Sequence, residues 1–341
     1  MMHIEPFVFN TPQLEGYAPN IKIAAKRYTS PSAGRENADG FTLICCHGLG
    51  QHKEQWDPIL EMLFSLHSQR HPRIREAWTF DWQHHGDSAL LNADILHNNT
   101  KVVDLRVWAA AIAGFIKSGR VDGHRLVGLG FSSGTVAISL STEYLNGAMS
   151  YCGMILIDPS MMDSEMWRDH HKEIQPVTEL VSKGAKMRRD GWASREHALK
   201  SLLNQYPYDC WDPRIVQVYV DHALYETTDA SGKVVVRRKT PAMQEADAFF
   251  LNLEITWDGL ETAAAIQGRV PIHMVLGTEF DLMPTMVRES MVDKKKGRVW
   301  ASVTHVEDVG HMVVQEKTDE VTQIISRILG QLAVPEVSAR L

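Results

Sequence analysis

The sequence predicts an α/β fold, with a mostly parallel sheet, helices on both faces and an inserted, mainly helical cap. Three observations predict it. Apolar runs of strand length alternate with amphipathic stretches of helical length, a glycine-rich turn joins one run directly to a helical stretch, and the alternation stops between about residues 161 and 268. Alternating strands and helices build parallel sheets that are covered on both faces.

The strand-length runs are mostly apolar, as is typical of strands buried on both faces. They lie at residues 41–46, 76–81, 125–131, 153–157, 272–276 and 299–306, and the amphipathic stretches lie at 54–67, 101–117, 135–145 and 318–332.

The interruption of the alternation predicts how the chain is divided. We expect a core in two parts, residues 1–160 and 269–334, a cap at 161–268 and a tail at 335–341. Within the cap the pattern is polar and mostly helical, with one hairpin expected near residues 229–238. Pockets of open α/β folds form at the carboxyl ends of the strands, so an insertion there is expected to cover a binding site.

Composition excludes several classes of protein. The chain has 341 residues, of which 44% are hydrophobic and 23% charged, and a formal net charge of -7, so it is expected to be globular and to bind neither nucleic acid nor an anionic membrane. A run of about 18 apolar residues without a charge, which a membrane span needs, is absent. The four cysteines are too few for a disulfide framework, which favours a reducing compartment.

The strongest local signal is Gly-Phe-Ser-Ser-Gly at residues 130–134, directly between an apolar run and a helical stretch. A strand that turns so tightly into a helix strains the residue at the turn, and glycines two positions before and after it leave the necessary room. Ser132 then lies at a helix N-terminus, where free N–H groups favour developing negative charge. We predict that Ser132 is a nucleophile, the plainer alternative being an ordinary Gly/Ser turn.

A nucleophilic serine needs donors for the oxyanion, and Cys-His-Gly-Leu-Gly at residues 46–50 ends an earlier strand. The backbone N–H of Leu49 and that of Ser133 are the predicted donors. His47 is expected to hold this loop rather than to transfer a proton. The histidine pair at residues 84–85 is expected to order the pocket floor, and no third ligand at useful spacing accompanies it, so neither a metal nor a cofactor is predicted.

The general base is predicted to be His311, which follows the last strand and precedes the final helix; His305, inside the strand pattern, is the local competitor. Two aspartates can orient this histidine, Asp158 after the run at 153–157 and Asp281 after the run at 272–276. Asp281 lies one residue farther from its glycine than the usual Gly-x-x-Asp spacing, which favours Asp158. Both stay open, and Glu279 is a further alternative.

The loop at residues 47–50, the turn around Ser132, the insertion and Gly310-His311 together resemble the α/β-hydrolase superfamily. Residues 52–58, 211–214 and 240–246 are similar to a fungal group that holds toxin-biosynthesis hydrolases, a peroxisomal lipase and the peroxisomal acyl-CoA hydrolase of mycophenolic acid biosynthesis. The resemblance implies a serine hydrolase of secondary metabolism that cleaves an acyl ester or thioester and needs no cofactor. The spacing at Asp281 departs from the superfamily pattern.

Two other functions stay open. The acyl group can pass to an alcohol, amine or carbon nucleophile, which makes the protein a transferase or cyclase, or the fold can bind a ligand without catalysis. The expected partner is a small acyl ester or acyl-CoA. Met161, Met162 and Trp167 are predicted to line the acyl pocket, and an arginine-rich group is expected to meet CoA phosphates, although plain packing and solvation are the simpler explanations. That group is Arg188, Arg189, Arg237, Arg238 and Lys239.

The last three residues, Ala339, Arg340 and Leu341, resemble a peroxisomal address of the Ser-Lys-Leu type. They predict a peroxisomal import receptor as a partner and the peroxisomal matrix as the location, the alternative being a frayed tail. Homo-oligomerisation stays open.

Overall fold

The computed structural model describes residues 2–30, 39–68, 72–98, 103–145, 147, 151–251 and 253–333. The predicted tail at 335–341, with its terminal tripeptide, lies outside these residues, so the peroxisomal location stays a prediction. Within the described ranges, no helix combines the length and the apolar character that crossing a bilayer requires.

An eight-stranded sheet forms the centre of the molecule, in the order β1-β2-β4-β3-β5-β6-β9-β10 among the described residues. The strands from β4 to β10 pair in parallel, whereas β1 and β2 add an antiparallel edge. The strand bounds are β1 His3–Asn10, β2 Lys22–Thr29, β3 Phe41–Cys46, β4 Ile74–Phe80, β5 Arg125–Phe131, β6 Gly153–Ile157, β9 Ile272–Gly277 and β10 Ser302–Val306.

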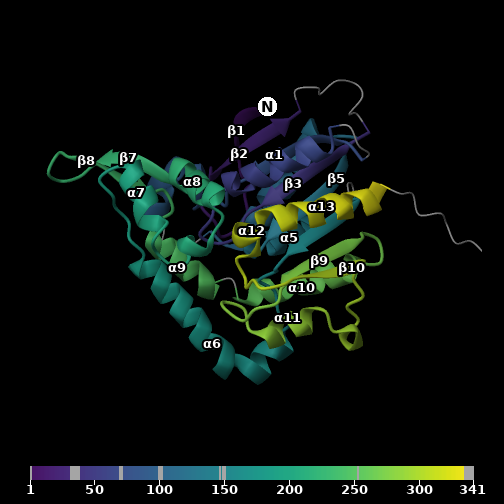
Figure 1. The fold of residues 1–341 in the computed structure, drawn as a ribbon. Helices are drawn as coiled ribbons and strands as arrows, with labels where there is room; N and C mark the ends of the chain where they lie inside the picture. The colour runs from purple at the N-terminus through teal and green to yellow at the C-terminus, as the bar shows by residue number, and fades with distance from the viewer. Residues whose placement is uncertain are drawn as a thin grey trace, which may run out of the picture.

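Helices cover both faces of this sheet, as the apolar strands predict (Figure 1). The helices around the sheet are α1 (Asp57–Leu66), α2 (Gly86–Leu91), α3 (Ala93–Asn98), α4 (Leu105–Phe115), α5 (Ser133–Leu145), α10 (Leu253–Ile266), α11 (Thr285–Met291), α12 (Val313–Glu316) and α13 (Thr318–Ala333). Short helical turns are η2 (Lys53–Trp56), η3 (Ile116–Arg120), η4 (Tyr208–Cys210) and η5 (Lys294–Lys296).

Strand β3 shows why both faces must be covered. Its neighbouring cysteines point in opposite directions, because successive side chains of a strand alternate between the two faces. Cys45 packs in the cluster that holds α1 and α13, and Cys46 packs in the cluster that holds α4 and α5. Both are fully buried free thiols, so this pair is part of the core.

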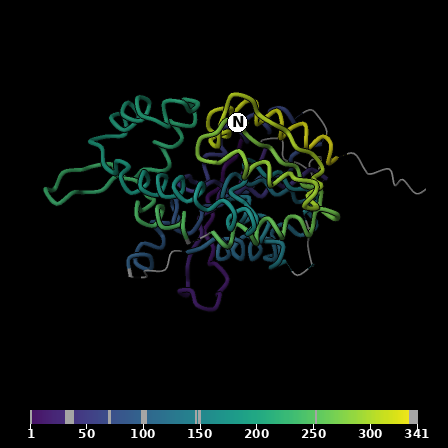
Figure 2. Tube along the Cα trace, turned by 90° about the horizontal axis from the view of Figure 1, so that it is seen from below, coloured from purple at the N-terminus to yellow at the C-terminus, as the bar shows by residue number. Residues whose placement is uncertain are grey.

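Between β6 and β9 the chain leaves the sheet and builds a further hydrophobic cluster, separate from the two that flank the sheet. This segment forms α6 (Ser164–Met187), α7 (Arg195–Leu202), α8 (Pro213–His222), the hairpin of β7 (Leu224–Thr228) and β8 (Val234–Arg238), α9 (Ala242–Leu251) and α10. Trp192, Trp211 and Tyr219 are central to the cluster. The hairpin is confirmed, and it lies at the end of the molecule opposite the end of α13 (Figures 1 and 2).

The last helix of the segment, α10, packs against α5 of the sheet layer, where a Cβ on Gly259 would come within 2.9 Å of the Val136 side chain. The division into core and cap at residues 160/161 and 268/269 stays a prediction.

Two features differ from the sequence-based expectation. The sequence does not predict the antiparallel strands β1 and β2, because β1 is mostly exposed and its one apolar run, Phe7 to Phe9, is short. The run at 299–306 becomes a strand only from Ser302. Before that point the chain is held by other bonds, since Val299 N–H donates to Gln267 Oε1 at 2.7 Å and Trp300 Nε1 donates to the Met291 carbonyl at 2.8 Å.

Candidate active site

The turn between β5 and α5 holds Ser132 in a strained conformation. Its φ of 52° lies in the left-handed region that side chains other than glycine rarely adopt. A Cβ on Gly130 would lie 2.6 Å from the Thr135 Cα, and one on Gly134 would overlap the Cys46 carbonyl group. Both neighbours must therefore be glycine, and the turn presents Ser132 to a pocket at the N-terminus of α5.

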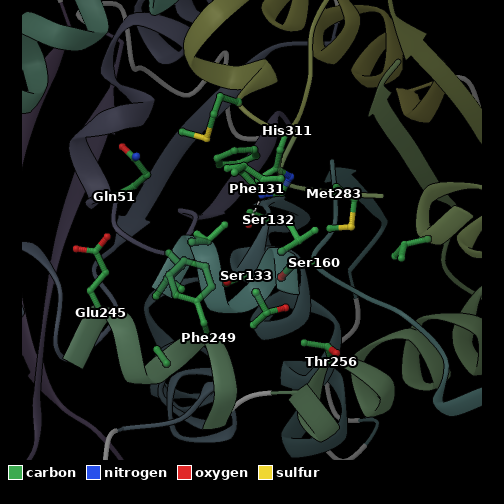
Figure 3. Close-up of a pocket in the computed structure, with 18 of the residues that line it drawn as sticks. Gln51, Phe131, Ser132, Ser133, Ser160, Glu245, Phe249, Thr256, Met283 and His311 are labelled. Atoms are coloured by element: carbon green, nitrogen blue, oxygen red, sulfur yellow. Dashed lines mark hydrogen bonds between the residues drawn. The ribbon is translucent and has the colours of Figure 1, made fainter. Parts of the chain in front are cut away.

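His311 reaches Ser132 from the loop between β10 and α12 (Figure 3). The Ser132 hydroxyl lies 2.8 Å from His311 Nε2, and His311 Nδ1 lies 2.5 Å from Asp158 Oδ2. An ionised carboxylate only accepts hydrogen bonds, so Nδ1 carries the proton and Nε2 is left to accept from the hydroxyl. A chain of this kind can remove the serine proton and stabilise the imidazolium that results.

Asp158 follows β6 and is surrounded by donors. Besides His311, it accepts hydrogen bonds from Arg288 Nε and Nη2, at 2.9 and 3.0 Å, and from the Gly277 N–H at 3.1 Å. Full burial favours the neutral acid, but the hydrogen bonds and positive charges of His311 and Arg288 outweigh it and hold the pKa of Asp158 below its usual range. Asp158 is therefore an ionised carboxylate, which the stabilisation of a His311 imidazolium requires. Arg288, in α11, was not anticipated, since nothing in its local sequence points to this contact.

Asp281 is also close to His311, but at its backbone. Asp281 Oδ2 accepts the His311 N–H at 2.8 Å, which fixes the loop rather than the imidazole ring. Glu279 is exposed, and its carbonyl accepts from Arg288 Nη1 at 2.6 Å. His305 is exposed on β10. Of the predicted alternatives, the structure thus places Asp158 on the ring and Asp281 on the main chain.

The two predicted oxyanion donors lie beside Ser132. Leu49 and Ser133 both line the same pocket, and within the described ranges no acceptor is bonded to either of their backbone N–H groups. Ser133 is the first residue of α5, where the N–H has no partner inside the helix. These two groups are therefore available to a negatively charged oxygen on the substrate.

Buried histidines hold the loop that carries Leu49. His47 donates from Nδ1 to the Gly48 carbonyl at 2.7 Å and accepts at Nε2 from the Trp82 N–H at 3.0 Å. His85 Nε2 accepts the Gly50 N–H at 2.9 Å, and Gly50 has a φ of 77°. Burial lowers the pKa of His47 to about 3 and that of His85 well below its usual value, so both stay neutral and can accept.

The pocket beside Ser132 has a cavity volume of about 200 Å³ and is mostly apolar. Its apolar wall comes largely from α6, α9 and the chain around α11, and includes Ile174, Val177, Val181, Phe249, Met283 and Val287. Such a lining suits an acyl chain of a small molecule. The sequence did not indicate these residues, because they come from elements far apart in the chain.

The three predicted acyl-pocket residues divide in the structure. Met162 lines the pocket. Met161 is fully buried in the hydrophobic core instead, because the chain after β6 turns its side chain inward. Trp167, on α6, has its ring 6.1 Å from that of His171 and is not among the pocket-lining side chains.

The arginine-rich group expected to meet CoA phosphates is largely paired within the protein. Arg188 and Arg238 both bond to Glu245, and Lys239 bonds to Asp87 at 2.5 Å. Arg238 is 5% exposed, so a phosphate in solvent does not reach it. Arg189 and Arg237 are exposed, while Arg188 lines the pocket.

The parallel sheet with a serine at the strand–helix turn and a histidine after the last strand defines an α/β hydrolase. The sequence matches the alpha/beta hydrolase family over residues 43–324, so the chain belongs to this family.

The curated relatives include the type I acyl-CoA thioesterase mpaH' of Penicillium brevicompactum, 26% identical over 245 residues, which cover 66% of this chain and 53% of the relative. The type I acyl-CoA thioesterase mpaH of Penicillium roqueforti is 29% identical over 198 residues, which cover 58% of this chain and 42% of the relative. The chain thus spans about half the length of the curated relatives it matches.

Among solved structures, the peroxisomal alpha-beta-hydrolase Lpx1 of Saccharomyces cerevisiae has a TM-score of 0.77 at 17% identity, covering 100% of this chain and 92% of its own. The thioesterase domain from the curacin biosynthetic pathway has a TM-score of 0.60 at 13% identity, covering 96% of this chain and 99% of its own. At these identities the likeness shows the fold.

Proposed function

We propose that the protein is a serine hydrolase that cleaves an acyl ester or thioester, with Ser132 as nucleophile, His311 as general base and acid, and Asp158 as the orienting carboxylate. The observation that carries the proposal is the hydrogen-bond chain from Ser132 through His311 to Asp158, at 2.8 and 2.5 Å, beside an apolar pocket.

The first half of the reaction forms an acyl-enzyme. Ser132 Oγ attacks the acyl carbonyl carbon while its proton passes to His311 Nε2, and the carbonyl oxygen becomes an oxyanion bound by the N–H groups of Leu49 and Ser133. The tetrahedral intermediate then collapses, the bond to the leaving group breaks, and His311 gives its proton to the departing sulfur or oxygen. Asp158 keeps Nδ1 protonated and balances the charge of the imidazolium.

The second half releases the acid. Water attacks the acyl-enzyme carbonyl and passes a proton to His311, and the collapse of this intermediate returns the proton to Ser132 Oγ. Each oxyanion donor typically contributes on the order of 3 kcal/mol to transition-state stabilisation.

The substrate class is supported by the pocket and by the relatives. An apolar wall next to the nucleophile accepts an acyl chain. The relatives named acyl-CoA thioesterases favour a thioester as the bond that is cleaved. Because the chain spans about half of their length, their activity enters here as part of the proposal.

The proposal is tested by labelling and by turnover. A fluorophosphonate probe is expected to label Ser132, and octanoyl-CoA or p-nitrophenyl octanoate to be hydrolysed, with Ser132→Ala abolishing both. Ser139→Ala is the matched control, since this hydroxyl is buried in α5, which begins directly after Ser132, and has no hydrogen-bond partner among the described residues. Labelling that persists in Ser132→Ala would remove the proposed nucleophile.

The products decide between the neighbouring functions. Free acid as the product supports a hydrolase. A condensed product, formed in preference to acid when alcohols or amines are supplied, would instead make the protein an acyltransferase. Ligand binding without labelling or turnover would leave a non-catalytic binder.

A further inference from the structure

The pocket beside Ser132 has a polar side as well as an apolar one. Gln51, Arg188, Tyr208 and Glu245 all line it. Figure 3 shows Gln51 and Glu245 together on one side of the pocket, while Met283 and Thr256 lie on the other, with Ser132 between them. Gln51 comes from the loop after β3, Arg188 from the end of α6, and Glu245 from α9, so only the folded chain brings them together.

The charges on this side do not balance. Glu245 Oε1 accepts from Arg188 Nη1 at 2.7 Å, and Glu245 Oε2 accepts from Arg238 Nη1 at 2.9 Å. One buried carboxylate therefore serves two guanidinium groups. A second carboxylate, Asp190, is half-exposed. Its Oδ1 lies 3.7 Å from Arg238 Nε and its Oδ2 lies 3.5 Å from Arg237 Nη1, so Asp190 pairs with a third arginine, Arg237, as well. Together the three arginines carry three positive charges against the two negative charges of Glu245 and Asp190, which leaves an excess of one positive charge.

Arg188 has donors left for a ligand. Its guanidinium carries five N–H groups, and Glu245 Oε1 is the one acceptor that the described part of the chain provides for it. Its side chain is 24% exposed although it lines the cavity, whereas Glu245 is 2% exposed. The unpaired donors of Arg188 are therefore the accessible part of the pair.

Gln51 supplies a second, independent observation. The residue is 5% exposed and lines the same pocket, yet its Oε1 has no hydrogen-bond partner among the described residues. Buried amide groups are nearly always bonded, so this amide is available to a polar group that enters the cavity. The two ends of an amide can exchange places, which lets Gln51 donate to an anion beside Arg188.

We propose that Arg188 and Gln51 form a subsite for a carboxylate at the far end of the substrate's acyl group, so that the preferred substrates are ω-carboxylated acyl esters or thioesters. This inference rests on the proposed function. A carboxylate supplies the charge that the arginine group lacks, and guanidinium and carboxylate match as bidentate partners. A neutral hydroxyl or amide leaves the excess charge uncompensated.

The subsite belongs to the acyl side of the substrate. A CoA leaving group is far larger than a cavity of about 200 Å³ and must extend into solvent. In the proposed binding mode the ester carbonyl lies at Ser132 and the free carboxylate at Arg188, since both side chains line the same pocket.

The test compares p-nitrophenyl monoesters of diacids, from four to ten carbons, with p-nitrophenyl esters of the matching monoacids. We expect one chain length at which the diacid ester has at least a tenfold higher kcat/KM. Arg188→Met is expected to remove this preference by raising KM for the diacid ester, and Gln51→Leu to reduce it. Arg189→Met is the matched control, because this neighbouring arginine is exposed and bonds to the Gly191 carbonyl.

A binding measurement keeps the subsite testable apart from turnover. In Ser132→Ala, the preferred free diacid is expected to bind at least tenfold more tightly than the monoacid of equal length, and Arg188→Lys to retain part of the difference if Arg188→Met does not fold. Equal affinities, or a matching preference for a neutral ω-amide, would overturn the carboxylate subsite while leaving hydrolysis intact. Absence of all hydrolysis with the diacid preference retained in binding would instead remove the proposed function and keep the subsite.

Discussion

Replacing Asp158 by Asn tests which carboxylate serves His311. Four N–H donors face the two oxygens of Asp158: Arg288 Nε and the Gly277 N–H at Oδ1, and His311 Nδ1 and Arg288 Nη2 at Oδ2. An asparagine has one oxygen, so its NH₂ group must face donors at one of these positions. The backbone N–H of Gly277 cannot change, whereas the imidazole of His311 can shift its proton to Nε2. The amide nitrogen therefore turns to His311, which then accepts at Nδ1, while Arg288 Nη2 loses its acceptor at this position.

This tautomer removes the base from the reaction. With the proton on Nε2, His311 no longer accepts from the Ser132 hydroxyl, and kcat is expected to fall by about 10⁴, as in other sites where the orienting aspartate becomes asparagine. That factor corresponds to about 5.5 kcal/mol of transition-state stabilisation. Arg288, 5% exposed, also loses its main counter-charge, and breaking a buried pair typically destabilises a fold by about 3–5 kcal/mol.

The assay is steady-state hydrolysis of a neutral aryl ester, run below the unfolding temperature of each variant as measured by circular dichroism. Asp281→Asn is the matched control. Its remaining oxygen can still accept the His311 backbone N–H, so kcat is expected to stay within about tenfold of the wild type. The reasoning is refuted if Asp281→Asn loses the larger share of kcat while folded Asp158→Asn retains activity.

Three further predictions follow from the surroundings of the site. His85→Phe keeps an aromatic ring stacked on Trp82 but removes the acceptor of the Gly50 N–H. We expect kcat to fall by roughly 10- to 100-fold, less than for a lost oxyanion donor. Partial rescue by His85→Gln in the same kinetic assay checks this prediction, and an unchanged kcat contradicts it. Gly134→Ala is expected to prevent stable folding or activity, because the added Cβ overlaps the Cys46 carbonyl. Gly330→Ala is its control: this position lies in open space on α13, so the free energy of unfolding measured in urea titrations is expected to rise by about 0.5–1 kcal/mol. Asp163 accepts hydrogen bonds from Arg298, Lys296 and the Met166 N–H. Although burial opposes ionisation, these bonds hold the pKa of Asp163 below its usual value, so its stabilising contribution is complete above the unfolded pKa of about 4 and is lost as pH falls. Asp163→Asn should therefore flatten the acid side of a plot of unfolding free energy against pH, and an unchanged slope counts against this prediction.

The central sheet could be predicted because the residue composition of its inner strands indicates that they are buried. Strands β3, β6 and β9 are buried at every position, and such continuous apolar runs are hard to place anywhere but inside a covered parallel sheet. The edge strands lack this signal. Strand β1 exposes most of its side chains, and β2 carries Lys26 and Arg27 within it, so their pairing depends on β4 and could not be predicted from their own residues.

The candidate site could be predicted where one short segment defines its own geometry. The turn around Ser132 is such a segment, since its glycines and its strand–helix junction are local in sequence. The walls of the pocket are different, because Gln51, Arg188 and Glu245 meet only after the chain between β6 and β9 has folded over the sheet. The same holds for Arg288, whose partner Asp158 is 130 residues away.

The two aspartates could not be separated in the sequence because both are needed at the same histidine. Asp281 packs against the loop so closely that a Cβ on Gly310 would overlap its carboxylate, and a Cβ on Gly277 would overlap the Gly310 carbonyl. These glycines let the loops after β9 and β10 touch, and Asp281 then accepts the His311 backbone N–H from the loop after β9. Because Asp281 occupies the side of His311 near its backbone, the imidazole ring points to the end of β6, where Asp158 is held as a carboxylate by Arg288. The spacing after Gly277 therefore differs from the usual pattern because this aspartate holds the histidine's main chain, and the carboxylate on the imidazole comes from the neighbouring strand.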